Sequence, residues 1–285
     1  MPDIQVVDYR SAHAPKNFAR SLKETGFGVI SNHPIKQDLI DWAYQEWGKF
    51  FKSTDKLNYP FDPKTHSGFI STELSETAKG FEKKDLKEFF HIYNETQCPP
   101  ALCEKTIALK AQLTDLGSQL LSWVDEHTPS DLRKKLDTSL PEMIHGSELH
   151  LFRLIHYPPL MGNEPEGAMR AAAHGDINLL TMLPAATAEG LQAKMTTGQW
   201  VDVPINSNWI VVNAGDMLEE CTGNYYPSTQ HRVLNPIGEA AKHSRLSMPL
   251  FLHPRDDVRL SDKYTAHSYR MERYQELGLN NKETY

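Results

Sequence analysis

The stretch that decides the fold spans residues 149–252, and near its centre residues 171–183 read AAAHGDINLLTML. Short runs rich in apolar and β-branched residues recur through this stretch, and clusters of Gly, Asn, Asp and Thr separate them. Such runs are typical of strands joined by turns. The expected strands are residues 149–157, 177–183, 190–194, 199–203, 209–213, 229–234 and 245–252. Many short strands at roughly even spacing predict a β sandwich, a β barrel or a jelly roll.

The first half of the sequence has a helical pattern instead. Apolar residues at helical spacing predict an amphipathic helix over about 35–51 and a longer helix over about 102–124, which ends before Pro129. The glycine-punctuated segment 26–30 predicts one short strand, and helical character returns over 262–279. We therefore expect an α+β chain in which helices wrap a β core.

Length and composition bound the class of protein. The chain has 285 residues, of which 39% are hydrophobic and 24% are charged. These values are ordinary for a globular protein, so they exclude a disordered or collagen-like chain. The 30 Lys and Arg residues against 37 Asp and Glu residues give a net charge of −7. This balance argues against nucleic acid as a partner, because nucleic-acid binding usually needs a basic face. The sequence leaves the oligomeric state open.

Three features predict the cellular location. No segment approaches the roughly 20 consecutive apolar residues that a membrane-spanning helix needs, so we expect no membrane partner. The opening residues, MPDIQVVD, contain neither a positive charge nor a hydrophobic stretch of the kind that marks a secretory signal. Cys98, Cys103 and Cys221 are odd in number and lack the spacing of a metal-binding knuckle. A cytoplasmic, reducing location is therefore expected.

A possible metal site is the motif His174-Gly175-Asp176 together with His231 far downstream. In an extended segment His174 and Asp176 project to the same face, and a distant strand can add a third ligand. Two imidazoles and one carboxylate with open positions are the arrangement of non-haem Fe(II) oxygenases. By composition about 1.7 His-x-Asp/Glu motifs are expected by chance, so the dipeptide spacing alone is weak. A hydrogen-bonded histidine and a turn-forming aspartate are the simpler alternative.

The surrounding motifs give this site a specific context. They occur in a fixed order over about a hundred residues, and that order resembles the Fe(II)/2-oxoglutarate-dependent dioxygenase superfamily, particularly its isopenicillin N synthase-like branch. The segment 18–34 resembles the N-terminal region of the same family. The core motifs are RLIHYPP (153–159), AHGD (173–176), GLQ (190–192), GQW (198–200), VP (203–204), VNAGDMLE (212–219), STQHRV (228–233) and RLS (245–247).

The resemblance implies a fold, a metal and a reaction. The fold would be a double-stranded β-helix, or jelly-roll, core flanked by N-terminal and C-terminal helices. His174, Asp176 and His231 would be the catalytic residues and the ligands of Fe(II). With 2-oxoglutarate as cosubstrate and dioxygen as oxidant, the protein would couple oxidative decarboxylation of 2-oxoglutarate to hydroxylation or desaturation of a small organic substrate.

The same resemblance implies a binding site for 2-oxoglutarate. Arg245 would hold the distal carboxylate, and Ser247 and Tyr157 would donate hydroxyl hydrogen bonds to it. The alternatives are a surface cation for Arg245 and ordinary strand packing for the two hydroxyl residues. Two positions depart from the pattern of the family: Ile155 stands where asparagine is common, and Gly175 stands where threonine is common. We expect the glycine to leave ligation intact and to relax a turn.

Two other functions are compatible with the sequence. One is an isopenicillin N synthase-like Fe(II) oxidase that does not use 2-oxoglutarate, in which Arg245 and Ser247 would serve the substrate's own carboxylate. Ile155 slightly favours this oxidase. The other is a non-catalytic jelly-roll binding protein, which the intact metal and arginine motifs argue against.

One charged segment, EKKDLKE (82–88), predicts a solvated helix face, although Lys87 or Glu88 could reach a substrate.

The domain organisation is expected to be one integrated structural unit. The expected parts are an N-terminal dioxygenase region over 1–100, scaffold helices over 101–147, the jelly-roll core over 148–253 and a C-terminal helix over 254–285.

Overall fold

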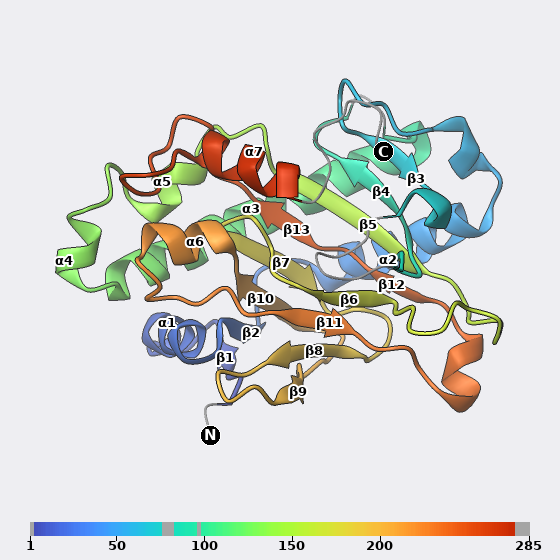
Figure 1. The fold of residues 1–285 in the computed structure, drawn as a ribbon, viewed down its shortest axis with the longest axis horizontal. Coiled ribbons are helices and arrows are strands. Elements are labelled where there is room, and N and C mark those ends of the chain that lie inside the picture. The colour runs from blue at the N-terminus through green and yellow to red at the C-terminus, as the bar shows by residue number, and fades with distance from the viewer. Residues whose placement is uncertain (1–2, 76–82, 96–97, 277–285) are drawn as a thin grey trace.

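Two β-sheets form the centre of the protein, as seen in a computed structural model that describes residues 3–75, 83–95 and 98–276 (Figure 1). The larger sheet contains β1 (Val6–Asp8), β2 (Phe27–Ser31), β3 (Gly68–Ile70), β4 (Glu88–Ile92), β5 (Leu151–Tyr157), β7 (Leu180–Pro184), β10 (Ile210–Ala214), β12 (Arg245–Ser247) and β13 (Leu250–Leu252). The smaller sheet contains β6 (Ala171–His174), β8 (Leu191–Lys194), β9 (Trp200–Asp202) and β11 (His231–Val233). The expected α+β fold with a jelly-roll core is confirmed.

The order of the strands shows how the N-terminal region joins the core. The large sheet runs β1-β2-β10-β7-β13-β5-β4-β3, with β12 also paired to β5, and the small sheet runs β6-β11-β8-β9. Strands β1 to β4 therefore extend the large sheet at both of its edges. Antiparallel pairing of β10 with β2, at Val212 opposite Gly28, makes the link on one side.

Side-chain alternation along the strands of the large sheet produces two cores. On β10, Val211 packs in the cluster between the two sheets, whereas Ile210 and Val212 pack toward the helices. Residues two apart on a strand share a face, so one strand serves both layers. The cluster between the two sheets, called the inner cluster below, also contains Ile155 and Tyr157 of β5. These two side chains therefore face the interior, where the site lies.

Seven helices are described, and the longest covers the outer face of the large sheet. Gly117 lies in the middle of α3, where a Cβ atom would come within 2.2 Å of the Leu252 side chain. Glycine is favoured there because α3 lies directly against β13. Trp47 of α2 donates a hydrogen bond to Thr106 of α3 at 3.0 Å, which joins the two helices. The helices are α1 (Ala14–Thr25), α2 (Gln37–Lys52), α3 (Pro100–His127), α4 (Ser130–Arg133), α5 (Leu140–Ile144), α6 (Asp216–Cys221) and α7 (Ala266–Glu276), with short 3-10 turns η1 (Asp55–Asn58), η2 (Thr72–Leu74) and η3 (Gly238–Lys242).

Several boundaries differ from the sequence prediction. The run 245–252 forms two strands, β12 and β13, because Pro249 interrupts it and cannot donate a ladder hydrogen bond. The run 177–183 becomes a strand only from Leu180, after a turn that follows Asp176. The C-terminal helix begins at Ala266, and the last residues predicted for it lie outside the described part of the chain.

The prediction of a solvated helix for the charged segment 82–88 is wrong. All but its first residue are described, and they form no helix: Lys83 and Lys84 are exposed, and the chain from Asp85 leads into β4 largely buried. Lys87 pairs with Asp85 at 2.8 Å, and both side chains are almost fully buried. Glu88 pairs with Lys56 at 2.9 Å. The charges of Asp85, Lys87 and Glu88 are therefore neutralised by partners inside the protein rather than by water.

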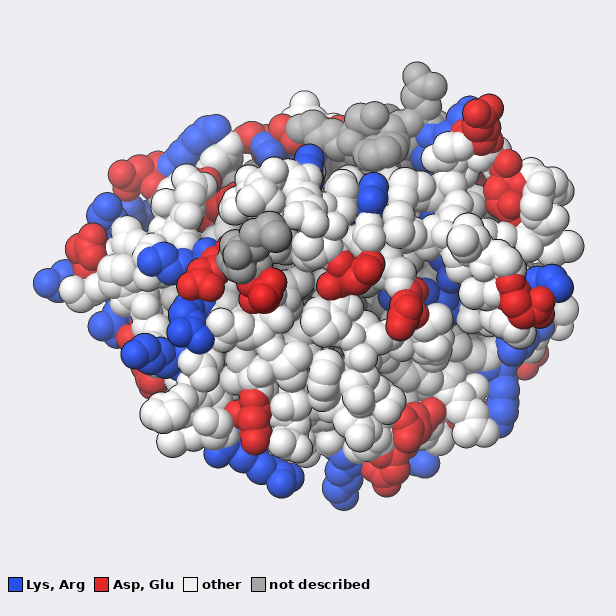
Figure 2. Space-filling model, turned by 90° about the horizontal axis from the view of Figure 1, so that it is seen from below, with Lys and Arg blue, Asp and Glu red and all other residues white. Residues whose placement is uncertain are grey.

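Charged side chains are distributed over the surface of the protein. On the face in Figure 2, positive and negative side chains are interspersed and much of the centre is uncharged, so this face has no extended basic area. None of the helices in the described segments has the length and apolar character that a bilayer crossing needs.

Candidate active site

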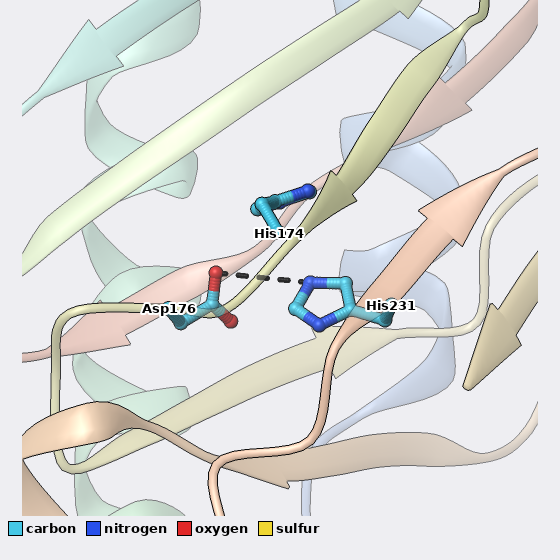
Figure 3. A group of neighbouring side chains, drawn as sticks. All are labelled: His174, Asp176 and His231. Carbon is cyan, nitrogen blue, oxygen red and sulfur yellow. Dashed lines mark ion pairs between the residues drawn. The ribbon is translucent and has the colours of Figure 1, made fainter. Parts of the chain in front are cut away.

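The three predicted metal ligands lie together at the ends of two paired strands. His174 ends β6 and stands directly opposite His231 at the start of β11, and Asp176 follows two residues after His174 (Figure 3). One ligand atom from each residue lies within 4.8 Å of the other two, so a single cation can reach all three after small side-chain rotations. The described residues contain no second group of this kind.

Hydrogen bonds fix which nitrogen of each histidine is available. His174 Nδ1 lies 2.7 Å from the Ala172 carbonyl oxygen, and His231 Nδ1 lies 3.2 Å from the Thr229 carbonyl oxygen. A carbonyl oxygen only accepts, so each Nδ1 carries the hydrogen. Both Nε2 atoms then keep a lone pair for a metal, and the rings are held in the orientation that ligation needs.

The carboxylate of Asp176 is oriented in the same way. Its Oδ2 accepts hydrogen bonds from Thr181 Oγ1 at 2.6 Å and from Asn213 Nδ2 at 2.7 Å. Its Oδ1 instead faces His231 Nε2 at 3.7 Å. One oxygen is therefore fixed by two donors, and the other points into the space between the histidines (Figure 3).

Local electrostatics favour the protonation states that bind a metal. Burial, together with the positive charge that His231 can carry, lowers the pKa of His174 to about 4, so this imidazole is neutral at pH 7. Burial alone would raise the pKa of Asp176, but its histidine neighbours and its hydrogen bonds outweigh burial, and the net pKa is lowered. Asp176 is an anion at neutral pH. The neutral imidazole of His174 and the carboxylate of Asp176 are the forms that bind Fe(II), and a site with three protein ligands leaves further coordination positions open.

Gly175 has a different role from the one expected. The φ angle of Gly175 is not positive, so no left-handed backbone conformation requires a glycine there. A Cβ atom at this position would lie 3.1 Å from both Asp216 Oδ1 and Ser228 Oγ. Glycine is favoured here because the α6 N-terminus and the loop before β11 approach the backbone closely.

The predicted 2-oxoglutarate residues also lie side by side, between the two sheets. Arg245 is the register partner of Tyr157, and Ser247 is the partner of Ile155, so β12 and β5 present these side chains to the interior. Arg245 is 2% exposed and donates through Nε to the Ala188 carbonyl oxygen at 2.9 Å. Its Nη1 has no hydrogen-bond partner among the described residues. The guanidinium lies 5.1 Å from the centre of the Tyr157 ring.

The roles of three residues of this region were not predicted from the sequence. Thr181 and Asn213 hold Asp176, and they are register partners on β7 and β10. Asn213 lies within a motif that was recognised, but its role depends on a pairing between strands far apart in the sequence. The third residue is Arg170, a buried cation immediately before β6.

Comparison with known proteins identifies the class to which this fold and site belong. The sequence profile of the 2OG-Fe(II) oxygenase superfamily matches residues 149–254, and the profile described as "non-haem dioxygenase in morphine synthesis N-terminal" matches residues 4–109. A protein from Shewanella oneidensis of known crystal structure is 45% identical, with a TM-score of 0.88, over 97% of this chain and 99% of the other. The chain belongs to the 2OG-Fe(II) oxygenase superfamily.

Curated relatives narrow the type of enzyme. Feruloyl CoA ortho-hydroxylase 2 of Arabidopsis thaliana is 25% identical over 90% of this chain and 70% of its own length. Gibberellin 2-beta-dioxygenase 3 of Arabidopsis thaliana is 24% identical over 95% of this chain and 85% of its own length. The protein is accordingly an Fe(II)- and 2-oxoglutarate-dependent dioxygenase, an oxidoreductase. The oxidase that dispenses with 2-oxoglutarate and the non-catalytic binding protein are not favoured.

Proposed function

We propose that His174, Asp176 and His231 hold Fe(II), and that Arg245, with Ser247 and Tyr157, binds the distal carboxylate of 2-oxoglutarate. The observation that carries the proposal is the hydrogen bonding of the metal ligands: both Nδ1 atoms and one carboxylate oxygen are engaged by the protein, so the remaining atoms converge on one point. Bound there, iron supplies the centre at which 2-oxoglutarate and dioxygen react and a substrate C–H bond is oxidised.

The chain's own residues position the reactants and exclude water. Arg245 offers a planar fork of donors to a carboxylate, and its buried position strengthens that pairing. The inner cluster, which includes Phe27, Leu183 and Val211, surrounds the site with apolar walls. Such walls keep solvent from a reactive centre and so suppress side reactions.

The names of the relatives suggest a class of substrate, and the composition of the chain suggests a cellular location. We propose a small organic molecule as substrate, hydroxylated or desaturated, because the named relatives act on feruloyl CoA and gibberellin. We also place the chain in the isopenicillin N synthase-like branch by its motif order, and in the cytoplasm, a location with which its three free cysteines agree. The segments 1–100, 101–147, 148–253 and 254–285 act as one unit in this proposal, which the shared large sheet supports.

Metal removal tests the proposed function. The Fe(II)-loaded protein is expected to convert 2-oxoglutarate slowly to succinate even without substrate, and faster when a true substrate is present. Treatment with a chelator should stop succinate formation, and added Fe(II) should restore it, because the reaction needs the ion held by the three ligands. Succinate is measured by mass spectrometry. Formation that survives complete metal removal would contradict the proposal.

A further inference from the structure

A second arginine lies beside the proposed carboxylate site. Arg170 precedes β6, at the opposite end of that strand from His174, and its side chain is 2% exposed. Its guanidinium carbon lies 5.9 Å from the centre of the Tyr157 ring, and that of Arg245 lies 5.1 Å from the same ring. One cation that precedes a strand of the small sheet and one cation on the large sheet are therefore both buried near one tyrosine.

Neither arginine has an anionic partner within the described segments. Arg170 donates through Nη2 to the His243 carbonyl oxygen at 3.0 Å, and Arg245 donates to the Ala188 carbonyl oxygen at 2.9 Å. Arg170 Nε and Arg245 Nη1 have no hydrogen-bond partner. No ion pair joins either guanidinium to a carboxylate among the described residues, although most other arginines there have one.

This arrangement is unfavourable without a ligand. Burial and the neighbouring charge of Arg245 both lower the pKa of Arg170, which reflects the cost of holding two cations together away from water. A buried charge is stable when an opposite charge pairs with it and satisfies its donors. The unused donors, Arg170 Nε and Arg245 Nη1, are available to an anion that enters between the sheets.

We propose that Arg170 is a second cation of the 2-oxoglutarate site, and that the distal carboxylate of the cosubstrate is bound by the guanidinium groups of both Arg170 and Arg245. This inference rests on the proposed role of Arg245. A carboxylate has two oxygens and can accept from two guanidinium groups at once. The pair would make the site select 2-oxo acids that carry a second carboxylate over those that do not.

A structural role is the alternative for Arg170. The hydrogen bond to the His243 carbonyl oxygen fixes the end of η3, and loss of this bond could disturb the loop before β12. Such a disturbance would weaken the binding of any 2-oxo acid at the metal. Loss of a carboxylate contact would instead weaken only ligands that have a distal carboxylate. The two roles are therefore distinguished by the choice of ligand.

The test compares two ligands on three variants. Dissociation constants for 2-oxoglutarate and for 2-oxobutyrate, which lacks the distal carboxylate, are measured anaerobically by calorimetry on the Mn(II)-substituted protein. For Arg170→Gln we expect affinity for 2-oxoglutarate to fall at least about tenfold and affinity for 2-oxobutyrate to change less than about twofold. Arg170→Lys keeps the charge but not the fork, and is expected to lie between wild type and Arg170→Gln.

Arg232→Gln is the matched control. Arg232 is an arginine of the small sheet that pairs with Gln192 and stacks on Trp200, so its loss should leave both dissociation constants unchanged. Equal weakening of both ligands in Arg170→Gln, or an unchanged affinity for 2-oxoglutarate, would overturn the inference and leave the role of Arg245 intact. Absence of 2-oxoglutarate binding to the wild type would overturn the proposed function as well.

A crystal structure of the wild-type complex tests the inference without any variant. We expect an oxygen of the distal carboxylate within hydrogen-bonding distance of an Arg170 nitrogen and another contact to Arg245. A carboxylate that contacts Arg245 alone would overturn the role of Arg170. This measurement also decides the matter if Arg170→Gln and Arg170→Lys do not fold.

Discussion

Replacing His231 with alanine is expected to abolish stoichiometric Fe(II) binding while the protein stays folded. In the proposed site His231 would be one of three protein ligands, and its Nδ1 is hydrogen-bonded to the Thr229 carbonyl oxygen. Loss of a hydrogen-bond partner of a ligand already costs about 10- to 100-fold in metal affinity, so loss of the ligand itself should cost more than about 100-fold. Iron content after anaerobic loading and desalting measures the effect.

A histidine outside the ligand group provides the control for this variant. His267 is exposed and faces Asp256 at 3.4 Å, so His267→Ala should retain iron at the wild-type level. Thermal unfolding of both variants shows whether the fold is kept. If folded His231→Ala protein binds Fe(II) with wild-type affinity, the third ligand has been assigned incorrectly.

The second large effect is expected for Arg245→Gln, in the binding of 2-oxoglutarate rather than of iron. Hydrogen bonds to a charged group contribute about 1.5–3 kcal/mol each, and loss of a fork at the upper end of this range corresponds to about 100-fold weaker binding. Fe(II) content should not change, because Arg245 is not one of the metal ligands. Affinity for 2-oxoglutarate is measured by anaerobic titration of the iron-loaded variant.

Two comparisons make the Arg245 result specific. Arg245→Lys keeps a positive charge but loses the planar fork, so its affinity for 2-oxoglutarate should fall between those of wild type and Arg245→Gln. Arg232→Gln should behave as wild type, because Arg232 donates to Gln192. Wild-type affinity in Arg245→Gln would show that the distal carboxylate binds elsewhere.

The sequence was sufficient to predict that His174, Asp176 and His231 come together, because their signal is local and ordered. His174 and Asp176 are two residues apart, and motifs in the expected order mark the position of His231. The structure confirms that the three meet, since β6 pairs with β11 at His174 and His231. The strand pattern likewise predicted a β sandwich, a β barrel or a jelly roll, and the resemblance to the dioxygenase superfamily implied the jelly roll.

The residues that support the ligands could not be predicted, because their role is created by long-range pairing. Thr181 and Asn213 come together only when β7 and β10 pair, and only then do both donate to Asp176. Arg170 and Arg245 are remote in sequence, and the fold places both guanidinium groups near the Tyr157 ring. No local pattern marks such an encounter.

The burial of charged residues in the segment that leads into β4 could not be predicted either, because it too depends on long-range contacts. A run of lysine and acidic residues is typical of a solvated helix, and nothing near Lys87 or Glu88 in the sequence indicates burial. The partner of Glu88 is Lys56, thirty-two residues earlier, and His156 of β5 also contacts it at 2.8 Å. Buried charges are tolerated when they are paired, and the pairing is visible only in the fold.

The most direct test of the account is anaerobic titration of the Fe(II)-loaded wild-type protein with 2-oxoglutarate, followed by visible absorption. A metal-to-ligand charge-transfer band arises only when the 2-oxo acid chelates the iron. The band therefore shows that Fe(II) and 2-oxoglutarate are bound at the same centre. We predict a band that saturates at one equivalent of 2-oxoglutarate and is absent from His231→Ala protein given the same Fe(II) and 2-oxoglutarate. A wild-type protein that holds stoichiometric Fe(II) and shows no such band would contradict the proposal that 2-oxoglutarate binds to Fe(II) at this site.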